Sequence, residues 1–381
     1  MCSTTFEVAQ IIERFSIQFQ QQYKPNIFIL RTLNTIHKCR TASLGGHIEK
    51  CDCCGKIRVS YNSCRNRNCP KCQSSKQAFW VEDRVNDALN VKHFHIVFTI
   101  PAQLNEICLL NNKWFYNTMF ACVAETLRTF GYSHYGVESG AICVLHTWGQ
   151  TLSFHPHIHC IVPAAGITLK GKAKRIGKQG NYLYPVQMLS ATFRGKMLEK
   201  IKFQLAKTKV LYKYKSLLNV LWKKPWNVHC EPPLGNSKQI VKYLGKYTHR
   251  VAISNQRIKN IDESGVSFFY KDYSDKCKRK ILKLSGVEFL RRFSMHILPY
   301  RFVKIRYYGI YSSKGKSLLA KTKKIIAKPK ETIQERLLRL TGFDVYKCPF
   351  CKKGKMFEIG ILPRIRSPII RLFKTKLYVD N

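Results

Sequence analysis

Three histidines stand at alternate positions in the stretch SFHPHIHCIVP, residues 153–163: His155, His157 and His159. The surrounding residues are typical of a β-strand, in which side chains two positions apart point to the same face. Neighbouring neutral imidazoles on one strand face can bind a divalent metal ion. A polar strand face packed against other side chains has the same pattern, so the rest of the sequence must decide.

The same histidine–hydrophobic–histidine pattern occurs at His93 and His95, so the pattern alone does not identify a site. The later copy has a further candidate ligand, because His146 belongs to the preceding expected strand and can meet His157 and His159 across a hairpin. Three imidazoles leave coordination positions open, which is typical of a catalytic metal site. Since carboxylates are scarce here, we expect Mg²⁺ or Mn²⁺, with a substrate phosphate completing the coordination shell.

Two tyrosines, Tyr243 and Tyr247 in KYLGKYTHR, lie four residues apart and therefore on one face of an expected helix. A phenol is a poor nucleophile at pH 7, but nearby cations can lower its pKa. The neighbouring cationic side chains are those of Lys242, Lys246, His249 and Arg250. Ordinary packing is the alternative, because the chain has 19 tyrosines.

Seven of the 16 cysteines lie between residues 39 and 72. In a reducing cytosol we expect metal ligands rather than disulfides. Cys51 and Cys54 form one CxxC knuckle, and Cys69 and Cys72 form a second after a 14-residue loop. This spacing predicts one closed, structural zinc site made by the two knuckles together.

The remaining candidate ligands in this region are Cys39, Cys64 and His47, which are enough for a second zinc. Cys53 lies inside a knuckle, and we interpret it as a bystander. A third knuckle, Cys348 and Cys351 in YKCPFCKKGK, has no evident partner pair. A loop with two reduced cysteines explains it as well as a metal site does.

The charge balance indicates a polyanionic partner. Lys and Arg number 66 against 22 Asp and Glu, which gives a formal net charge of +44. Nucleic acid is the first candidate and an anionic membrane surface the alternative. No stretch approaches the roughly 18 to 20 apolar residues that span a bilayer, and the N-terminus does not read as a signal peptide. We therefore expect a cytoplasmic, nucleoid-associated protein without a membrane partner.

Apolar periodicity predicts the elements that would position these residues. Helices are expected within 6–37 and over 112–130, 187–206 and 236–250; strands are expected over 93–101, 140–148 and 153–163. This order of strands and helices predicts an α+β fold with an antiparallel sheet.

Several stretches in order resemble the transposases of the insertion sequence 91 family, two-tyrosine members of the HUH endonuclease superfamily. They are CRTASLGGH, YNSCRNRNCPKCQ, FTIP, LHTWGQTLSFHPHIHCIVPAAG, YLGKYTHRVAISNQRI and RRFSMHILPYRFVKIRYYG, within residues 39–309. The resemblance implies N-terminal helices and a zinc-binding domain over 1–85, an HUH domain of antiparallel sheet with flanking helices over 86–310, and a basic C-terminal region over 311–381. One departure is Asn68, where the family pattern has histidine.

The resemblance also implies roles for single residues. His157 and His159 match the HUH metal ligands, Tyr243 and Tyr247 match the paired nucleophiles, and His146 matches a third metal ligand by its place on the neighbouring strand. The implied activity is nicking and rejoining of single-stranded DNA at transposon ends and target, through a 5′-phosphotyrosine, in rolling-circle transposition. An oligomer is compatible with this activity.

Three alternatives remain at this point. A relaxase or rolling-circle replication initiator has the same chemistry, and a non-catalytic zinc-dependent DNA-binding protein would explain the charge and the cysteines. A carboxylate-triad transposase is less attractive with 22 acidic residues. The stretch 312–330, with seven lysines and no acid, is interpreted as a phosphate-contacting segment, the alternative being a solvated basic linker.

Overall fold

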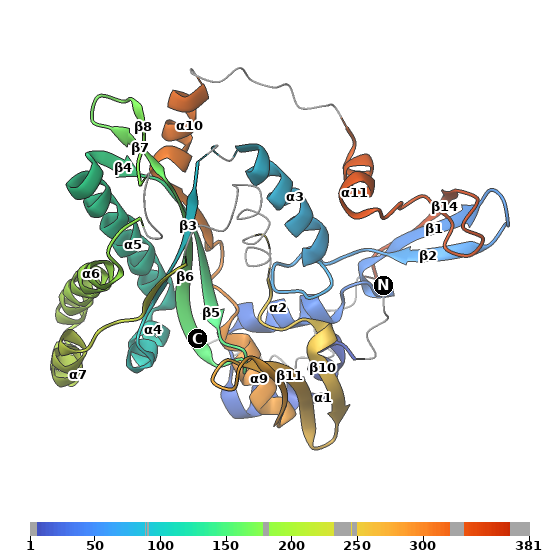
Figure 1. Ribbon diagram of the computed structural model, residues 1–381. Helices are drawn as coiled ribbons and strands as arrows, with labels where there is room; N and C mark the ends of the chain where they lie inside the picture. Colours follow the sequence, from blue (N-terminus) through green and yellow to red (C-terminus); the bar gives the residue numbers. More distant parts are fainter. Residues whose placement is uncertain are drawn as a thin grey trace, which may run out of the picture.

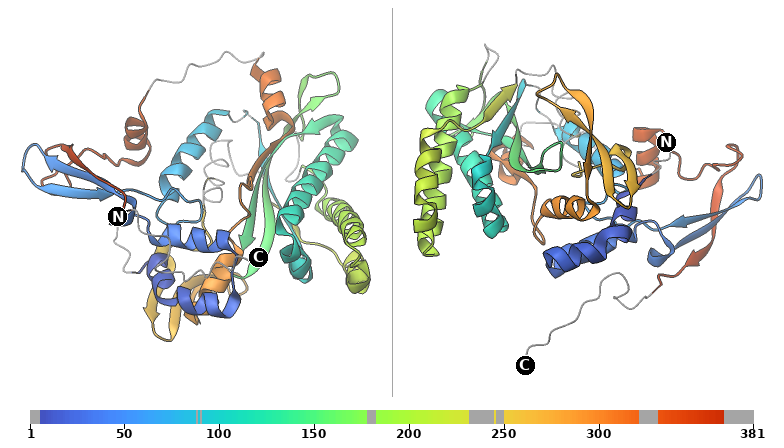
Figure 2. Two further views of the ribbon diagram at one scale, coloured as in Figure 1. Left: turned by 180° about the vertical axis from the view of Figure 1, so that it is seen from behind. Right: turned by 90° about the horizontal axis from the view of Figure 1, so that it is seen from below.

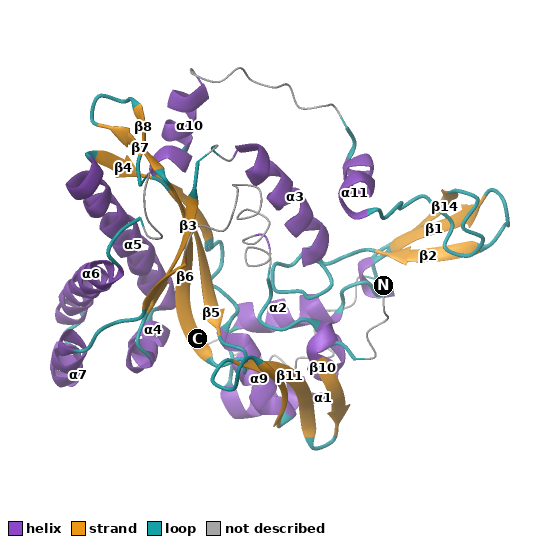
Figure 3. Ribbon diagram, viewed as in Figure 1, coloured by secondary structure: helices purple, strands orange, loops and turns teal. Residues whose placement is uncertain are grey.

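The computed structural model describes residues 6–87, 89, 91–177, 183–231, 245, 250–320 and 331–365. Helices and antiparallel sheets alternate along the chain, as Figure 3 shows, so the expected α+β class is confirmed. None of the helices within these residues is long and apolar enough to cross a membrane.

The central element is a five-stranded antiparallel sheet with the strand order β13-β5-β6-β3-β9. Its strands are β3 (His93–Thr99), β5 (Ala141–Trp148), β6 (Phe154–Pro163), β9 (Val228–Glu231) and β13 (Ile305–Tyr308). Because side chains alternate between faces, Ile158, Cys160 and Val162 of β6 point to one face, and His157 and His159 point to the other. The central strand β6 thus presents these two histidines, and the neighbouring strand β5 carries His146.

Four helices cover the first face of this sheet, on the left in Figure 1. They are α4 (Asn105–Leu110), α5 (Asn112–Tyr135), α6 (Val186–Lys207) and α7 (Leu211–Lys223). Phe98 of β3 packs edge-on against Phe193 of α6, and both are fully buried in the largest core. This core supports the strands from the face opposite the histidines. A small sheet in the order β4-β7-β8 (Val137–Ser139, Ala165–Thr168 and Ala173–Arg175) continues the layer beyond the end of β6.

A second core joins the N-terminal helices to a later part of the chain. Its elements are α1 (Val8–Tyr23), α2 (Ile27–His37), β10 (Ile258–Asp262), β11 (Gly265–Asp272), β12 (Lys278–Leu284) and α9 (Gly286–Met295). Figure 2 shows α1 in blue against α9 in orange. Ser285 caps α9 by accepting a hydrogen bond from the Glu288 backbone N–H. Residues on both sides of the expected domain boundary at 85 therefore contribute to one core.

The C-terminal part of the chain returns to the N-terminal hairpin. Strand β14 (Met356–Leu362) pairs with β1 (Gly46–Cys51), which pairs with β2 (Ile57–Tyr61), so residues about 300 positions apart share one sheet (Figure 1). Before it, α11 (Ile333–Thr341) lies against α3 (Gln73–Asp87). The helix α10 (Ser313–Ala320) packs instead beside the central sheet.

Most of the expected elements are confirmed. The helices over 112–130 and 187–206 and the strands over 93–101 and 140–148 appear with ends within five residues of the expected ones. The expected helix over 236–250, which carries both tyrosines, lies outside the described residues except at Gly245 and Arg250.

Candidate active site and cysteine clusters

His146, His157 and His159 form one cluster. Their nearest ring nitrogens lie within 4.8 Å of one another. His146 of β5 stands directly opposite His157 of β6 in the antiparallel register, and His159 follows two residues later on the same face. The three candidate ligands predicted from the strand pattern are therefore brought together. His155 contacts His157 with ring centroids 5.2 Å apart but is not part of the cluster.

Hydrogen bonds orient two of these imidazoles. The Nδ1 of His157 lies 2.7 Å from the backbone carbonyl of His155, which can only accept, so Nδ1 carries the proton and Nε2 has the lone pair. The Nδ1 of His95 lies 2.9 Å from a Glu231 carboxylate oxygen, and its Nε2 lies 2.9 Å from Nδ1 of His159. If His95 donates to Glu231, His159 donates to His95 through its Nδ1–H, and the lone pair of His159 lies on Nε2.

Burial keeps these imidazoles neutral. Desolvation lowers the pKa of His157 to about 4 and places the pKa of His159 well below its ordinary value. Desolvation also lowers the pKa of His95, although Glu231 opposes the shift. Neutral imidazole is the form that binds a metal ion, so His157 and His159 can act as ligands at pH 7.

The cluster opens into a pocket of about 290 Å³ with a basic wall. Arg250 and Arg257 line it, and Glu231 is the one carboxylate among its described lining residues. The guanidinium of Arg257 donates to the backbone carbonyls of Phe269, at 2.8 Å, and Gln150. Burial lowers the pKa of Arg257 to about 10, which leaves it charged at pH 7. A phosphate group would therefore meet cationic side chains beside the histidines.

His93 and His95, the other pair with this spacing, have different contacts. His93 bonds to the carbonyl of Val91 at 2.9 Å and to the hydroxyl of Tyr311 at 2.5 Å, at the far end of the strand. His95 instead hydrogen-bonds to His159 and so orients its ring. The sequence pattern identified neither role, because both depend on which strands lie beside β3.

Tyr243 and Tyr247 lie outside the described residues, so their positions remain predictions. Two described residues that flank the tyrosines in sequence, Glu231 and Arg250, both line the pocket. Gly245, which lies between the tyrosines in sequence, is buried, and an added Cβ would collide with Val81 of α3.

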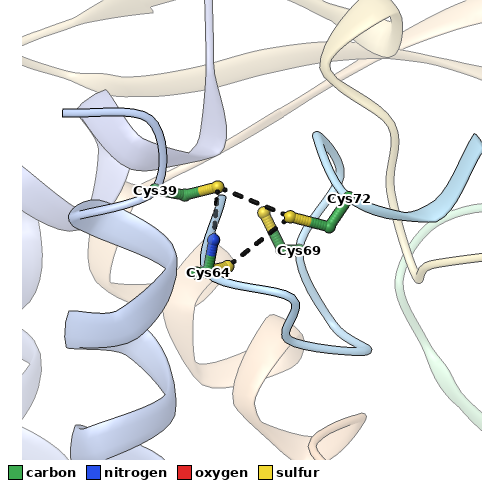
Figure 4. A group of neighbouring side chains, drawn as sticks. All are labelled: Cys39, Cys64, Cys69 and Cys72. Carbon is green, nitrogen blue, oxygen red and sulfur yellow. Dashed lines mark hydrogen bonds between the residues drawn. The ribbon is translucent and has the colours of Figure 1, made fainter. Parts of the chain in front are cut away.

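Four thiols in the second core form a cysteine cluster, which Figure 4 shows. Cys39, Cys64, Cys69 and Cys72 have their sulfur atoms within 4.8 Å of one another. Cys72 Sγ lies 3.5 Å from that of Cys39 and 3.7 Å from that of Cys64. Four sulfurs around a zinc with Zn–S bonds of about 2.3 Å would be about 3.8 Å apart. The donor set therefore fits a closed, tetrahedral zinc site.

The predicted grouping of the two knuckles is wrong. Cys51 and Cys54 do not join Cys69 and Cys72; they lie within 4.8 Å of Cys348 and Cys351. The reason is that β1 carries the first knuckle away from the second core into the sheet with β14. Cys39 and Cys64, expected to serve a second zinc, complete the first cluster instead.

His47 and Cys53 take part in neither group. His47 Nδ1 lies 3.4 Å from Glu358, and Cys53 is exposed. Asn68, where we expected histidine, hydrogen-bonds to the Asn66 side chain. All four thiols of the first cluster are in place beside it.

Comparisons with known proteins match two regions of the chain. Residues 11–100 match the family described as "Transposase zinc-binding domain", and residues 140–317 match the one described as "Putative transposase". "Putative transposase y4qJ" of Sinorhizobium fredii is 38% identical over 386 residues, which cover 95% of this chain and 97% of that protein. The chain belongs to the insertion sequence 91 family of transposases.

A second relative is the "Transposase for insertion sequence element IS801" of Pseudomonas savastanoi pv. phaseolicola. It is 25% identical over 292 residues, which cover 75% of this chain and 70% of that protein. No solved structure matches this transposase significantly. The matched zinc-binding domain and the cysteine clusters together support structural zinc.

Proposed function

We propose that this transposase nicks and rejoins single-stranded DNA through a 5′-phosphotyrosine, during rolling-circle transposition. The observation that carries the proposal is the cluster of His146, His157 and His159, which opens into an arginine-lined pocket. Glu231 and Arg250, the described residues before and after the two tyrosines in sequence, both line that pocket. Its substrate is therefore expected to be a phosphodiester, and its nucleophile a phenol.

The three histidines fit a divalent metal ion by donor chemistry. Two of them direct Nε2 lone pairs away from the groups that orient them, and burial keeps them neutral. A Mg²⁺ or Mn²⁺ bound there would neutralise charge on the scissile phosphate. Of the two ions, Mn²⁺ accepts nitrogen ligands more readily, and ligand type contributes to metal selectivity.

The chain's own groups account for the covalent step. The phenolate oxygen of Tyr243 or Tyr247 attacks the phosphorus, an O–P bond forms, and the bond from phosphorus to the 3′ oxygen breaks. The departing oxygen takes up a proton and becomes a free 3′-OH. The positive charges of Arg250 and Arg257 would stabilise the phosphate as its charge increases. The phosphotyrosine ester conserves the bond energy, so rejoining needs no ATP.

Two nucleophiles would allow two linked cleavages. While one tyrosine holds a donor end, the other can cleave a second strand, and the free 3′-OH of one strand can attack the ester on the other. This exchange is what distinguishes transposition from a single nick. A relaxase or replication initiator would share the first step, but membership of a transposase family favours the exchange.

The binding surface and the structural zinc complete the proposal. A net charge of +44 favours association with DNA largely through phosphates. We assign one structural zinc to Cys39, Cys64, Cys69 and Cys72, which are buried or half-buried beside the N-terminal helices. A non-catalytic DNA-binding protein would use these features but would have no use for the histidine cluster.

The decisive experiment uses single-stranded oligonucleotides that carry the element ends, incubated with the full-length protein and Mn²⁺. A label at the 3′ end should become covalently attached to the protein, and a label at the 5′ end should remain on a released fragment that a polymerase can extend. The exposed His134→Ala is the matched control and should retain both signals. Cleavage without a protein adduct would indicate hydrolysis, as expected of a carboxylate-triad enzyme, and would overturn the phosphotyrosine proposal.

A further inference from the structure

A second cluster of four thiols joins the two ends of the described chain. Cys51 is the last residue of β1 and Cys54 follows it, and Cys348 and Cys351 precede β14. The Sγ atoms of Cys51 and Cys351 are 3.7 Å apart, and those of Cys54 and Cys348 are 3.8 Å apart. A disulfide would bring two sulfurs to about 2.05 Å, whereas four zinc-bound thiolates lie about 3.8 Å apart. The observed spacing is that of a metal-bound set.

The backbone around these thiols is shaped as two facing knuckles. The backbone N–H of Cys54 points to Cys51 Sγ at 3.5 Å, and the N–H of Gly354 points to Cys351 Sγ at 3.4 Å. Each knuckle thus directs an amide dipole at a sulfur, which stabilises a thiolate. An added Cβ at Gly354 would lie 2.6 Å from Cys51 Sγ, so only glycine allows the knuckles to approach this closely.

Hydrogen bonds also link one knuckle to the other. The backbone N–H of Asp52 donates to the Lys355 carbonyl at 3.1 Å, and the Lys355 N–H donates to the Asp52 carboxylate at 2.8 Å. These bonds hold the two turns in register and bring two thiols from each to a common centre.

This end of the molecule has too little apolar core to fold by burial alone. Its hydrophobic cluster consists of Cys51, Cys348 and Met356, with Cys351 packed against it. The large apolar side chains of the adjoining sheet are exposed instead: Ile57, Val59, Tyr61, Phe357, Ile359 and Ile361. Small folds without a sufficient core need a metal or a disulfide.

We propose that Cys51, Cys54, Cys348 and Cys351 bind a second structural zinc ion, which fastens the C-terminal segment to the N-terminal hairpin. Neither matched family region assigns this site, because residues 348 and 351 lie beyond both 11–100 and 140–317. The site requires ligands from both ends of the chain, so it forms only after residues about 300 positions apart have met.

The second zinc would complete a double attachment of the C-terminal segment. Arg336 of α11 already pairs with Glu82 at 2.6 Å and Asp83 at 2.9 Å on α3. Partly exposed ion pairs contribute little by themselves. Strand β14 is also held by its pairing with β1, so the zinc site would be the main attachment of the preceding residues 343–355, and its loss should loosen them.

Metal analysis of the full-length protein tests the proposal. Wild type should contain two zinc ions per chain, and Cys348→Ser/Cys351→Ser should contain one. Cys351→His, which keeps a ligand of the right kind, should retain two. The exposed Cys277→Ser is the matched control and should also retain two. Two zinc ions in the double serine variant would overturn the second site, and so would one zinc ion in the folded wild type.

Limited trypsin digestion gives an independent readout of the attachment. In the zinc-loaded wild type, cleavage after Lys347, Lys352, Lys353 and Lys355 should be slow. It should become at least about tenfold faster in Cys348→Ser/Cys351→Ser, while sites in α5 and α6 stay protected. Equal cleavage rates at these lysines in both proteins would show that no zinc holds the segment.

Discussion

The histidine cluster and the cysteine cluster at Cys51 and Cys348 are candidate metal sites of opposite construction. The histidines lie on the central strand β6 and its neighbour β5, in a sheet whose other face carries the largest core among the described residues. The four cysteines stand on a three-stranded sheet with almost no core of its own. In the first case the protein would position the metal; in the second the metal would position the protein.

The two sets of ligands also differ in how they are oriented and in how many coordination positions they leave open. His157 and His159 are oriented by hydrogen bonds and neighbouring strands before any metal binds, and three imidazoles leave coordination positions open for a substrate. Four cysteines close a tetrahedral shell and leave none. A metal site with open coordination positions, on a sheet that already has a large core, suits catalysis. A site with a closed shell, on a sheet that lacks its own core, suits stabilisation of the fold.

Removal of both tyrosine oxygens is expected to have the largest effect. Tyr243→Phe/Tyr247→Phe should form no covalent DNA adduct, because phenylalanine preserves the ring and removes the attacking oxygen. Either single variant can still nick, since a neighbour one helical turn away can reach the same phosphate, but transposition should fail in both. Denaturing gels detect the adduct, and mass spectrometry identifies the modified residue. An adduct on a tyrosine outside 243–247 would place the nucleophile elsewhere.

His157→Ala is expected to abolish nicking with little effect on folding. The metal-supported charge stabilisation is worth several kcal/mol, so the rate should fall by about 10³-fold or more. The melting temperature should shift by only a few degrees, because the side chain makes one hydrogen bond, worth about 1 kcal/mol, to its own strand. Binding of single-stranded DNA should persist. Rapid cleavage in Mn²⁺ buffer would remove the histidines from the mechanism.

Cys69→Ser should have the opposite effect to His157→Ala: the protein should fail to fold, and activity would be lost for that reason. Cys69 is fully buried in the core shared by the N-terminal helices. A structural zinc contributes about 10–16 kcal/mol in small zinc domains, which is as large as the whole stability of a typical domain, about 5–15 kcal/mol. Soluble yield and zinc content measure the effect, with Cys277→Ser as the control. A soluble, folded wild type without zinc would contradict the assignment.

Glu231→Gln should have an intermediate effect, confined to the metal. The carboxylate accepts from His95, which in turn contacts His159, so its charge increases the basicity of a candidate ligand. Loss of such an outer partner typically weakens metal affinity about 10- to 100-fold. Titration with Mn²⁺ measures it without reference to cleavage. Glu106→Gln, on the helical layer, is the control. Unchanged affinity in Glu231→Gln, with affinity lost in His157→Ala, would show that the hydrogen-bond chain is only structural.

The sequence predicted the site that depends on residues close together in the chain. It did not predict contacts between residues that are far apart in the chain. The alternation of His157 and His159, and the nearby His146, are local features of a hairpin, so they identified the histidine cluster. The role of His95 depends on the strand order β6-β3-β9, which no local pattern specifies. The cysteine spacing favoured the wrong grouping, because a 14-residue loop can close a zinc site but does not require it, and the true partners of Cys51 lie about 300 residues away.

The smallest expected effect concerns Lys321, Lys323 and Lys324, which lie outside the described residues. Their flanks are attached at α10 on one side and at α11 on the other. If these lysines contact phosphates of a single strand, each contributes about 0.7 to the slope of log affinity against log salt concentration. Reversal of all three to glutamate should therefore reduce the slope by about 2 in magnitude.

The control for this prediction must change the net charge by the same amount, at lysines that lie away from the proposed phosphate contacts. Lys207, Lys209 and Lys213 are exposed on the helical layer, and their reversal to glutamate alters the total charge by the same amount. A general field effect would lower affinity equally in both triple variants, because it depends on total charge. Phosphate contacts would flatten the slope only in the variant at 321, 323 and 324. Identical slopes would identify the segment as a solvated linker between two attached ends.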